Sequence, residues 1–509
     1  MFSLVAAAAV SIPGCAFWPR KYDLELRSAV LQPSRRYDFS EWLNANNNLP
    51  RTAIVVTISG GGTRAAALAF ATLKQLSQVN MTCPPRLADR AHCTAADSVI
   101  LVAAISGGSF TAAQFALSGA DGLDSSFEQK VIKQNTSHLA IGGFLKPIYW
   151  GDRTAQVVDT FDSVLQFDSR PATFMDIDFR KQPFLLLQGT DILSGRAVPL
   201  VQDWFDDICS DVNRLSLSLG VAIAGSLPFA LNGVHLENYR ESTGCRAIDA
   251  DYEPSTSTSH LAETAALARE NPLEANVARY RLWLRAALPM TVTGGDGKVV
   301  AKIENPRHRT IKYLHLFDGG LSDNLGIRHM MRTIVNDGTM KSLAQKGVTN
   351  IAFIAINAHS DPIDADYLKL SGPNWIPSLI MSAAFGPVER TSEMTTFIQD
   401  ENLALFFSSK SPSDSTLYPN AFVIKIDPDV LAGTGRAEVL REDFKAISLL
   451  DQINDPQIDL MREMLTQITD QSPCWNRLKD DSYSGCYVYF PGMQARATLV
   501  PEKSVQPKK

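Results

Sequence analysis

Several signatures of common binding sites are missing from this chain of 509 residues. No Cys-x-x-Cys and no pair of histidines one helical turn apart occurs, so the usual zinc-ligand spacings are absent. Neither Gly-x-x-x-x-Gly-Lys-Ser/Thr nor Gly-x-Gly-x-x-Gly occurs, and these are the loops that cradle nucleotide phosphates. No internal repeat of fixed period is visible. We therefore expect neither a metal site nor a cofactor.

An excess of positive charge is also missing. Lys and Arg number 48 against 54 Asp and Glu, which gives a formal net charge of -6. Proteins that bind nucleic acid usually carry a basic surface, so the composition argues against nucleic acid as the main partner. Hydrophobic residues make up 45% of the chain and charged residues 20%, so one large or two medium domains can bury a substantial core.

The start of the chain lacks a hydrophobic run long enough to span a bilayer. Residues 4–10 are apolar but too few for a membrane helix, and they are typical of the central region of a secretory signal. The small residues before Cys15 resemble a bacterial lipoprotein cleavage site, with Cys15 as the lipidated residue. Because no Lys or Arg precedes this run and Pro13 adjoins the cut, a plain secretory or inert segment remains an alternative. We predict an exported protein of the bacterial cell envelope, lipid-anchored or periplasmic.

Cysteines are few, seven in all, and six remain once Cys15 is set aside. An even number suits an exported, oxidised protein. Proximity in sequence suggests three disulfides, although spacing alone does not fix the connectivity, and ordinary buried thiols are the alternative. The suggested pairs are Cys83 with Cys93, Cys474 with Cys486, and Cys209 with Cys245.

The stretch around Ser106 is the clearest candidate for chemistry. Residues 99–103 are typical of a buried strand, and residues 110–117 have the composition of a helix. Between them lies a sharp turn centred on Ser106, in which Ala104 and Gly108 are small. Strand, turn with a central serine, and helix is the layout of a nucleophile elbow. The positive end of the following helix would favour a negative oxygen there. A glycine-rich turn without chemistry is the alternative.

A second unit of strand, glycine turn and helix precedes the elbow. Residues 53–58 predict a strand and residues 65–79 a helix, with Gly60, Gly61 and Gly62 between them. Glycine N–H groups can converge on one anionic oxygen, and a following helix adds its dipole. Since the nucleotide-loop spacings are absent, an oxyanion hole for Ser106 fits this turn best. Arg64 would hold the glycine loop or meet a substrate phosphate.

A third strand, residues 311–317, ends at Asp318-Gly319-Gly320. Together with an apolar strand at 350–358, these units alternate with helices, which predicts a parallel sheet covered on both faces. Catalytic groups in such sheets gather at the carboxyl ends of the strands, where the glycines, Ser106 and Asp318 would meet. Asp318 would then act as a base, and a turn or capping aspartate is its structural alternative.

Further elements surround this core. Residues 183–191 and 196–200 predict a hairpin, and residues 421–426 a late strand. Residues 458–469 predict an amphipathic helix, because apolar side chains fall on one face at helical spacing. Composition changes over residues 251–308, and we interpret about 240–309 as an insertion with a long helix at 261–288 and a turn at 294–297.

The order and spacing of these motifs resemble the patatin-like phospholipase family. The resemblance covers roughly residues 51–408 without the insertion, and it includes the run 222–229 and the hairpin at Thr190-Asp191. It implies a three-layer α/β/α fold with a mainly parallel central sheet and an inserted helical segment. It also implies a lipid acyl hydrolase of phospholipase A or lysophospholipase type with a Ser-Asp dyad.

The resemblance assigns a role to each motif residue. Ser106 would be the nucleophile and Asp318 its base, and Arg64 matches the arginine that follows the glycines and would contact substrate. The oxyanion donors would be Gly60, Gly61 and Gly62. Ala104 departs from the family's usual glycine, which bears on the detailed geometry of the elbow.

Two other functions remain open. A Ser-Asp-His triad of the α/β-hydrolase type would use Ser106, Asp318 and His359 in that chain order, with His315 and His329 as further candidates. A non-catalytic lipid-binding protein of the envelope could also keep this fold, because fold does not fix function.

The expected organisation is a signal peptide at 1–14, a tether or N-terminal arm at 15–50, a catalytic domain at 51–470 and a C-terminal tail at 471–509. The expected partners are a lipid or phospholipid substrate and a membrane surface, met peripherally or through the lipid anchor.

Overall fold

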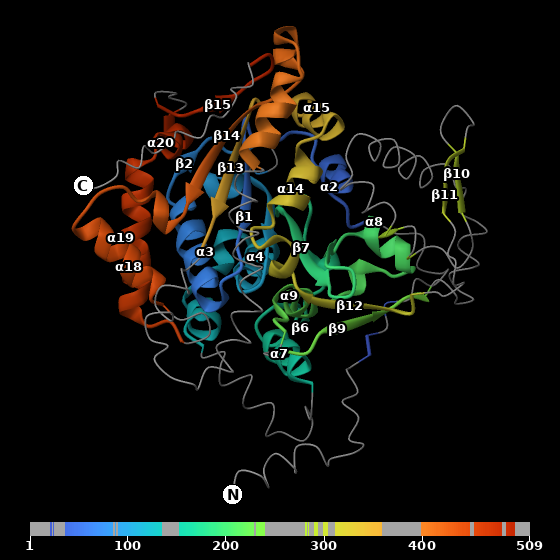
Figure 1. Ribbon diagram of the computed structural model, residues 1–509. Coiled ribbons are helices and arrows are strands. Elements are labelled where there is room, and N and C mark those ends of the chain that lie inside the picture. The colour runs from blue at the N-terminus through green and yellow to red at the C-terminus, as the bar shows by residue number, and fades with distance from the viewer. Residues whose placement is uncertain are drawn as a thin grey trace, which may run out of the picture.

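The computed structural model describes the backbone of the residues drawn as coloured ribbon in Figure 1. They are residues 21–22, 24, 36–84, 87, 90–134, 152–228, 231–239, 280–281, 284, 290–293, 299–303, 311–358, 399–447, 452–480 and 485–493.

A nine-stranded sheet runs through the middle of this described part (Figure 1). Its strand order is β15-β14-β13-β1-β4-β7-β12-β9, and β8 pairs with β7 off this path. The strands are β1 (Thr52–Ile58), β4 (Val99–Ala104), β7 (Phe184–Asp191), β8 (Arg196–Pro199), β9 (Val234–Glu237), β12 (Tyr313–Asp318), β13 (Asn350–Ile356), β14 (Asn420–Ile426) and β15 (Val488–Tyr489). The central five, β14 to β7, are parallel, and the strands beyond them are antiparallel.

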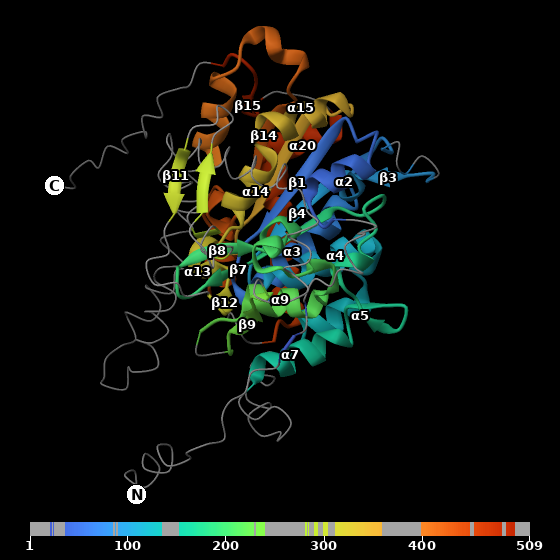
Figure 2. The ribbon, with the colours of Figure 1, turned by 90° about the vertical axis from the view of Figure 1, so that its right-hand side faces the viewer.

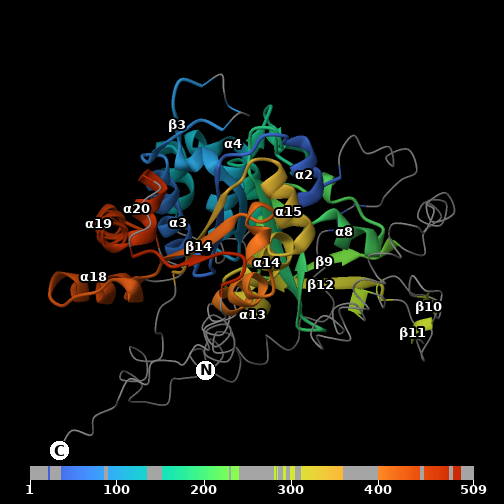
Figure 3. The same ribbon diagram turned by 90° about the horizontal axis from the view of Figure 1, so that it is seen from above.

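Helices cover both faces of the sheet, as the view from above shows (Figure 3). One face carries α3 (Gly62–Leu76), α4 (Gly108–Ser118), α7 (Arg153–Asp162), α9 (Leu217–Gly225), α18 (Arg436–Lys445), α19 (Asp455–Gln471) and α20 (Pro473–Asp480). The other carries α2 (Phe39–Ala45), α14 (Ile327–Ile334) and α15 (Asp337–Gln345). Short elements complete the set: α5 (Ser125–Phe127), α8 (Gln202–Phe205), α13 (Gly320–Asp323), β2 (Asn80–Met81), β3 (Cys93–Thr94), β5 (Gln166–Phe167) and β6 (Arg170–Pro171).

The composition of the central strands explains this layering. Every residue of β1, β4, β7 and β13 is buried, which is what helices on both faces of a parallel sheet require. The predicted three-layer α/β/α fold with a mainly parallel sheet is therefore confirmed. The predicted strands around Ser106, the glycines and Asp318 are β4, β1 and β12, and the predicted hairpin is β7 with β8. The predicted amphipathic helix is α19, whose apolar face is buried.

The end of the predicted N-terminal tether is part of the core. Tyr37 and Trp42 are fully buried, and the Tyr37 hydroxyl donates to the Leu185 carbonyl at 2.9 Å. Tyr37 also stacks on Phe184 with ring centroids 4.9 Å apart. Residues 36–50 thus pack against the sheet, as an N-terminal arm and not as a free tether, because two large aromatic side chains are buried beside β7.

The C-terminal segment also joins the sheet. β15 pairs antiparallel with β14 through Tyr489 and Val488. This differs from the expected tail beyond residue 470, because the chain folds back after α20 and adds an edge strand (Figure 2).

The described parts of the predicted insertion include a hairpin, β10 (Met290–Thr293) with β11 (Val299–Ile303), which brackets the predicted turn. The predicted helix at 261–288 lies almost entirely outside the described residues.

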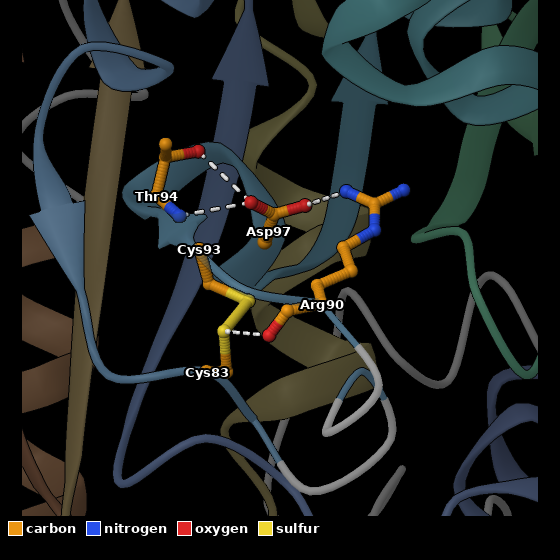
Figure 4. Close-up of a disulfide and its surroundings, with 5 residues drawn as sticks. All are labelled: Cys83, Arg90, Cys93, Thr94 and Asp97. Carbon is orange, nitrogen blue, oxygen red and sulfur yellow. Dashed lines mark hydrogen bonds and ion pairs between the residues drawn. A yellow bond between two sulfur atoms is a disulfide. The ribbon is translucent and has the colours of Figure 1, made fainter.

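Two of the suggested disulfides are present. Cys83 bonds to Cys93, and Cys474 bonds to Cys486. Beside the Cys83–Cys93 bond, Asp97 accepts hydrogen bonds from the N–H and the hydroxyl of Thr94. It also forms an ion pair with Arg90 at 2.8 Å (Figure 4). Cys209 is also disulfide-bonded, but its suggested partner Cys245 lies outside the described residues. The bonds fit an oxidising environment.

Among the described helices, none combines the length and the hydropathy that crossing a membrane requires.

Candidate functional site

Ser106 lies on a strained turn between β4 and α4. Its φ is +48°, a left-handed conformation that non-glycine residues rarely adopt. The turn is held because the Ile105 N–H donates to the Ile58 carbonyl at 3.1 Å and the Ser106 N–H donates to the Ala224 carbonyl at 3.0 Å. The side chain of Ser106 is half-buried. The backbone therefore has the geometry expected of a nucleophile elbow.

Two glycines after the serine are required by close packing. A Cβ on Gly107 would lie 1.9 Å from the Gly62 carbonyl oxygen, and one on Gly108 would lie 2.4 Å from Ile58 Cγ2. The elbow and the glycine loop are thus in direct contact. Ala104, where the family has glycine, is buried at the end of β4 and its methyl group is accommodated there.

The glycine loop leads from β1 into α3. Gly61 has φ +133° and Gly62 has φ +58°, so both adopt backbone conformations that favour glycine. Both are partly exposed. The Gly60 N–H instead donates to the Asn324 carbonyl at 2.9 Å, so this donor is already engaged. Gly61 and Gly62 are therefore better placed to offer N–H groups than Gly60, the third predicted donor.

Asp318 ends β12 and is buried, with 4% of its surface exposed. The Gly320 N–H donates to Asp318 Oδ1 at 2.8 Å, and the Ser106 side chain acts on the same carboxylate as a hydrogen-bonding neighbour that lowers its pKa. Burial raises the pKa of Asp318 from 3.8 to about 6, although both hydrogen bonds act in the opposite direction. The structure thus brings together the serine and the aspartate that the sequence singled out.

The carbonyl of Ala224, near the end of α9, connects the loops that carry Ser106 and Asp318. It accepts the Ser106 N–H at 3.0 Å and the Gly319 N–H at 3.1 Å. The backbone carbonyl of Ser226 accepts the Asp318 N–H at 3.0 Å. From the sequence, the run 222–229 is recognisable only as part of the resemblance to the patatin-like family. Nothing in its sequence marks a single carbonyl as the bridge, because that role depends on where α9 ends relative to β4 and β12.

Asn324 is a second residue that the sequence analysis missed. Its backbone carbonyl anchors Gly60, and its side-chain oxygen lies 2.3 Å from the point where a Gly60 Cβ would be. Ser106 Cβ lies 3.2 Å from the same point, so this amide is next to the serine. The available signal was its place six residues after Asp318 in the same glycine-rich loop.

Arg64 is buried, with 1% exposed, and its guanidinium donates to three backbone carbonyls. The acceptors are Ala358 at 3.0 Å, Ile447 at 2.8 Å and Lys445 at 3.3 Å. Burial lowers the pKa of Arg64 to about 10. This arrangement favours a role in holding the glycine loop against the C-terminal segment over the contact with substrate that the resemblance implied.

The histidine alternatives differ in position. The ring of His315 points to His235 on β9, two strands beyond β7, and His329 lies on α14 with its pKa lowered to about 3 by burial. In the described part of the chain, neither hydrogen-bonds to Ser106 or Asp318. His359 lies outside the described residues, as does residue 15. No group of three or more His, Cys, Asp or Glu side chains suited to a metal occurs among the described residues.

Comparison with known proteins found no match in sequence and a distant similarity in structure. No protein-family model matches the chain, and no curated protein matches it in sequence. Among solved structures, it is similar to human GIVD cytosolic phospholipase A2 at 12% sequence identity and a TM-score of 0.39. The alignment covers 86% of this chain and 61% of the length of that one. This TM-score is too low to support an assignment of fold or function, and we draw none from it.

Proposed function

We propose that this protein is a serine hydrolase that cleaves lipid esters, with Ser106 as nucleophile and Asp318 as base. The observation that carries the proposal is that the Ser106 side chain acts on a buried carboxylate and lowers its pKa, from a left-handed turn that touches the glycine loop. A serine hydroxyl is a weak nucleophile unless an adjacent base takes its proton. The lipid class of the ester rests on the motif resemblance to patatin-like phospholipases.

In the first half-reaction the Ser106 oxygen attacks the ester carbonyl while its proton passes to Asp318. A raised pKa suits this exchange, because the carboxylate binds the proton and can then return it. The tetrahedral intermediate collapses when Asp318 protonates the leaving alcohol, and the acyl group stays on Ser106. Water then repeats the sequence, with Asp318 as base, and releases the fatty acid.

The negative oxygen of the intermediate needs fixed donors. We assign this role to the N–H groups of Gly61 and Gly62, with Gly107 as a further donor because it directly follows the nucleophile and touches the Gly62 carbonyl. A single donor of this kind typically stabilises the transition state by about 3–4 kcal/mol.

The test is hydrolysis of p-nitrophenyl esters of increasing acyl length by the purified chain and its variants. Ser106→Ala and Asp318→Ala should each remove nearly all activity, whereas His359→Ala should keep most of it. Ser109→Ala is a matched control, because this buried hydroxyl lies three residues after Ser106, in the first turn of α4, and has no hydrogen-bond partner among the described residues. Circular dichroism should show that all four variants are folded.

Each alternative makes a different prediction. If His359→Ala is inactive and Asp318→Ala retains activity, a histidine-dependent triad replaces the dyad. If the wild-type protein hydrolyses neither these esters nor phospholipid vesicles, a non-catalytic lipid-binding function becomes the better description.

We further propose that Cys15 carries the lipid anchor. The disulfides fit export to an oxidising compartment, and the sequence before Cys15 supplies the signal. Labelled palmitate should be incorporated into the wild-type protein in a bacterial host and not into Cys15→Ser. Labelling that survives this substitution would contradict the proposal.

A further inference from the structure

Two histidines face each other across neighbouring strands at the edge of the sheet, where β9 and β12 lie in Figure 1. His235 and His315 are directly opposite in the antiparallel register. Their Nδ1 atoms are 2.6 Å apart, and the rings meet edge to face with centroids 4.7 Å apart. Both side chains are half-buried, so water reaches the pair.

This approach restricts what can lie between the rings. Each neutral imidazole carries one protonated and one unprotonated nitrogen, so two Nδ1 atoms at this distance share a single proton. Protonating the second Nδ1 as well would make one ring positive and set two N–H groups against each other. An alternative occupant is one cation that accepts both lone pairs, and imidazole nitrogen is a preferred ligand of zinc, copper and nickel ions.

A carboxylate supplies negative charge beside the pair. Asp152 acts electrostatically on His235, and it precedes α7, whose Arg153 N–H donates to the Asn232 side chain at 3.1 Å. Asn232 lies two residues before β9, so this bond fixes the start of α7 near His235. At the end of β7, the Asp191 carboxylate accepts the backbone N–H of His315 at 3.4 Å and the Tyr280 hydroxyl at 2.8 Å. Asp152 therefore adds negative charge in the surroundings of the pair, which favours a bound cation.

We propose that His235 and His315 form a two-imidazole site for a divalent transition-metal ion of the zinc class, completed by water. Zinc–nitrogen bonds of about 2.0–2.1 Å in tetrahedral geometry set the two nitrogens about 3.3 Å apart, so the rings need to separate by less than about 1 Å. The site is separate from Ser106 and takes no part in the proposed ester hydrolysis.

The test is zinc binding to the full chain. Bound metal is first removed with a chelator, and zinc binding is then measured by isothermal titration calorimetry. We expect one zinc ion per chain in the wild type, and affinity weakened by more than about tenfold in His235→Gln and in His315→Gln. His92→Gln is the matched control, because His92 is exposed and lies outside the pair, and it should bind as the wild type does. Thermal unfolding without metal should be recorded for each variant, so that loss of folding is not mistaken for loss of a ligand.

A spectroscopic measurement identifies the ligands independently. Copper bound to the wild type should give an electron paramagnetic resonance spectrum with hyperfine splitting from two nitrogens, reduced to one in either variant. If zinc does not bind, or binds equally well to the double variant, the two rings form only a hydrogen-bonded pair and the proposal fails. Neither outcome depends on ester hydrolysis, so it is distinguishable from failure of the proposed function.

Discussion

At the scale of single residues, Asp318 combines two properties that oppose each other. Its carboxyl group is buried, which penalises the charged form, and yet the proposed reaction needs that charged form as a base. The hydrogen bonds from Ser106 and Gly320 compensate only in part, since the pKa stays raised at about 6. A stability cost at the site is the expected consequence.

The raised pKa of Asp318 predicts how both ester hydrolysis and protein stability depend on pH. Ester hydrolysis should rise as the pH passes through about 6 and level off above it, because only the ionised carboxylate takes the serine proton. Since the folded state holds the proton more tightly than the unfolded state, the contribution of Asp318 to stability should fall as the pH rises from 3.8 to about 6.

Asp318→Asn isolates the second effect. The amide keeps the shape and an acceptor oxygen but carries no charge, so above that pH range we expect an inactive protein that is more stable by about 1–3 kcal/mol. Urea unfolding at about pH 5 and about pH 8 should show the larger gain at the higher pH. A gain that shrinks with rising pH would mean that the carboxylate is not destabilised by burial.

At the scale of elements, the site depends on how closely two turns approach. The β1–α3 loop and the β4–α4 elbow touch at Gly62 and Gly107, where no side chain fits. The end of α9 then fixes the β12 loop and the elbow through one carbonyl. Helices α3 and α4 both begin at these turns, so their positive ends lie beside the serine.

Gly107→Ala should therefore separate the two turns. The added methyl group would meet backbone at 1.9 Å, which cannot be relieved by a side-chain rotation, so we expect loss of most activity and a clear loss of stability. Gly338→Ala in α15 is the matched control. The nearest atom to its Cβ is 3.5 Å away, and alanine favours helix by up to about 1 kcal/mol. Thermal unfolding and ester hydrolysis of both variants decide the point, and an active Gly107→Ala would show that the turns can separate freely.

At the scale of the whole molecule, Arg281 attaches the predicted insertion to α8 and to the helical turn that follows it. Its guanidinium binds Asp207 at 2.6 Å and Asp203 at 2.8 Å, and it lies 5.2 Å from the centre of the Trp204 ring. The side chain of Asp207 is fully buried. Next to it, the Tyr280 hydroxyl donates to Asp191 at the end of β7 at 2.8 Å.

Removing this arginine should be costly. Arg281→Met leaves the Asp207 carboxylate buried without its cation, and breaking a buried pair in this way costs about 3–5 kcal/mol. Arg436→Met is the control, since the pair of Arg436 with Glu463 is exposed and little change is expected. Urea unfolding compares the two, and equal stabilities would show that the insertion is not held by Arg281.

The sequence by itself determined the order of the elements and the chemical groups at their ends. Strands β1, β4 and β13 were predictable because they are short apolar runs, of which β1 and β4 lead into glycine turns, and α19 was predictable from its helical spacing. The proposed nucleophile and base were identified because Ser106 and Asp318 each follow such a strand. Two disulfides followed from spacing.

The tertiary structure decided what each group touches. Only the fold shows that the Ala224 carbonyl connects the two loops and that the Asn324 carbonyl accepts the Gly60 N–H. It also shows that the Arg64 guanidinium donates its hydrogen bonds to backbone carbonyls. It also placed Tyr37 and Trp42 in the core and brought His235 to His315 across 80 residues of chain. These contacts join residues far apart in sequence, and local periodicity carries no information about which distant partner a side chain or a carbonyl will meet.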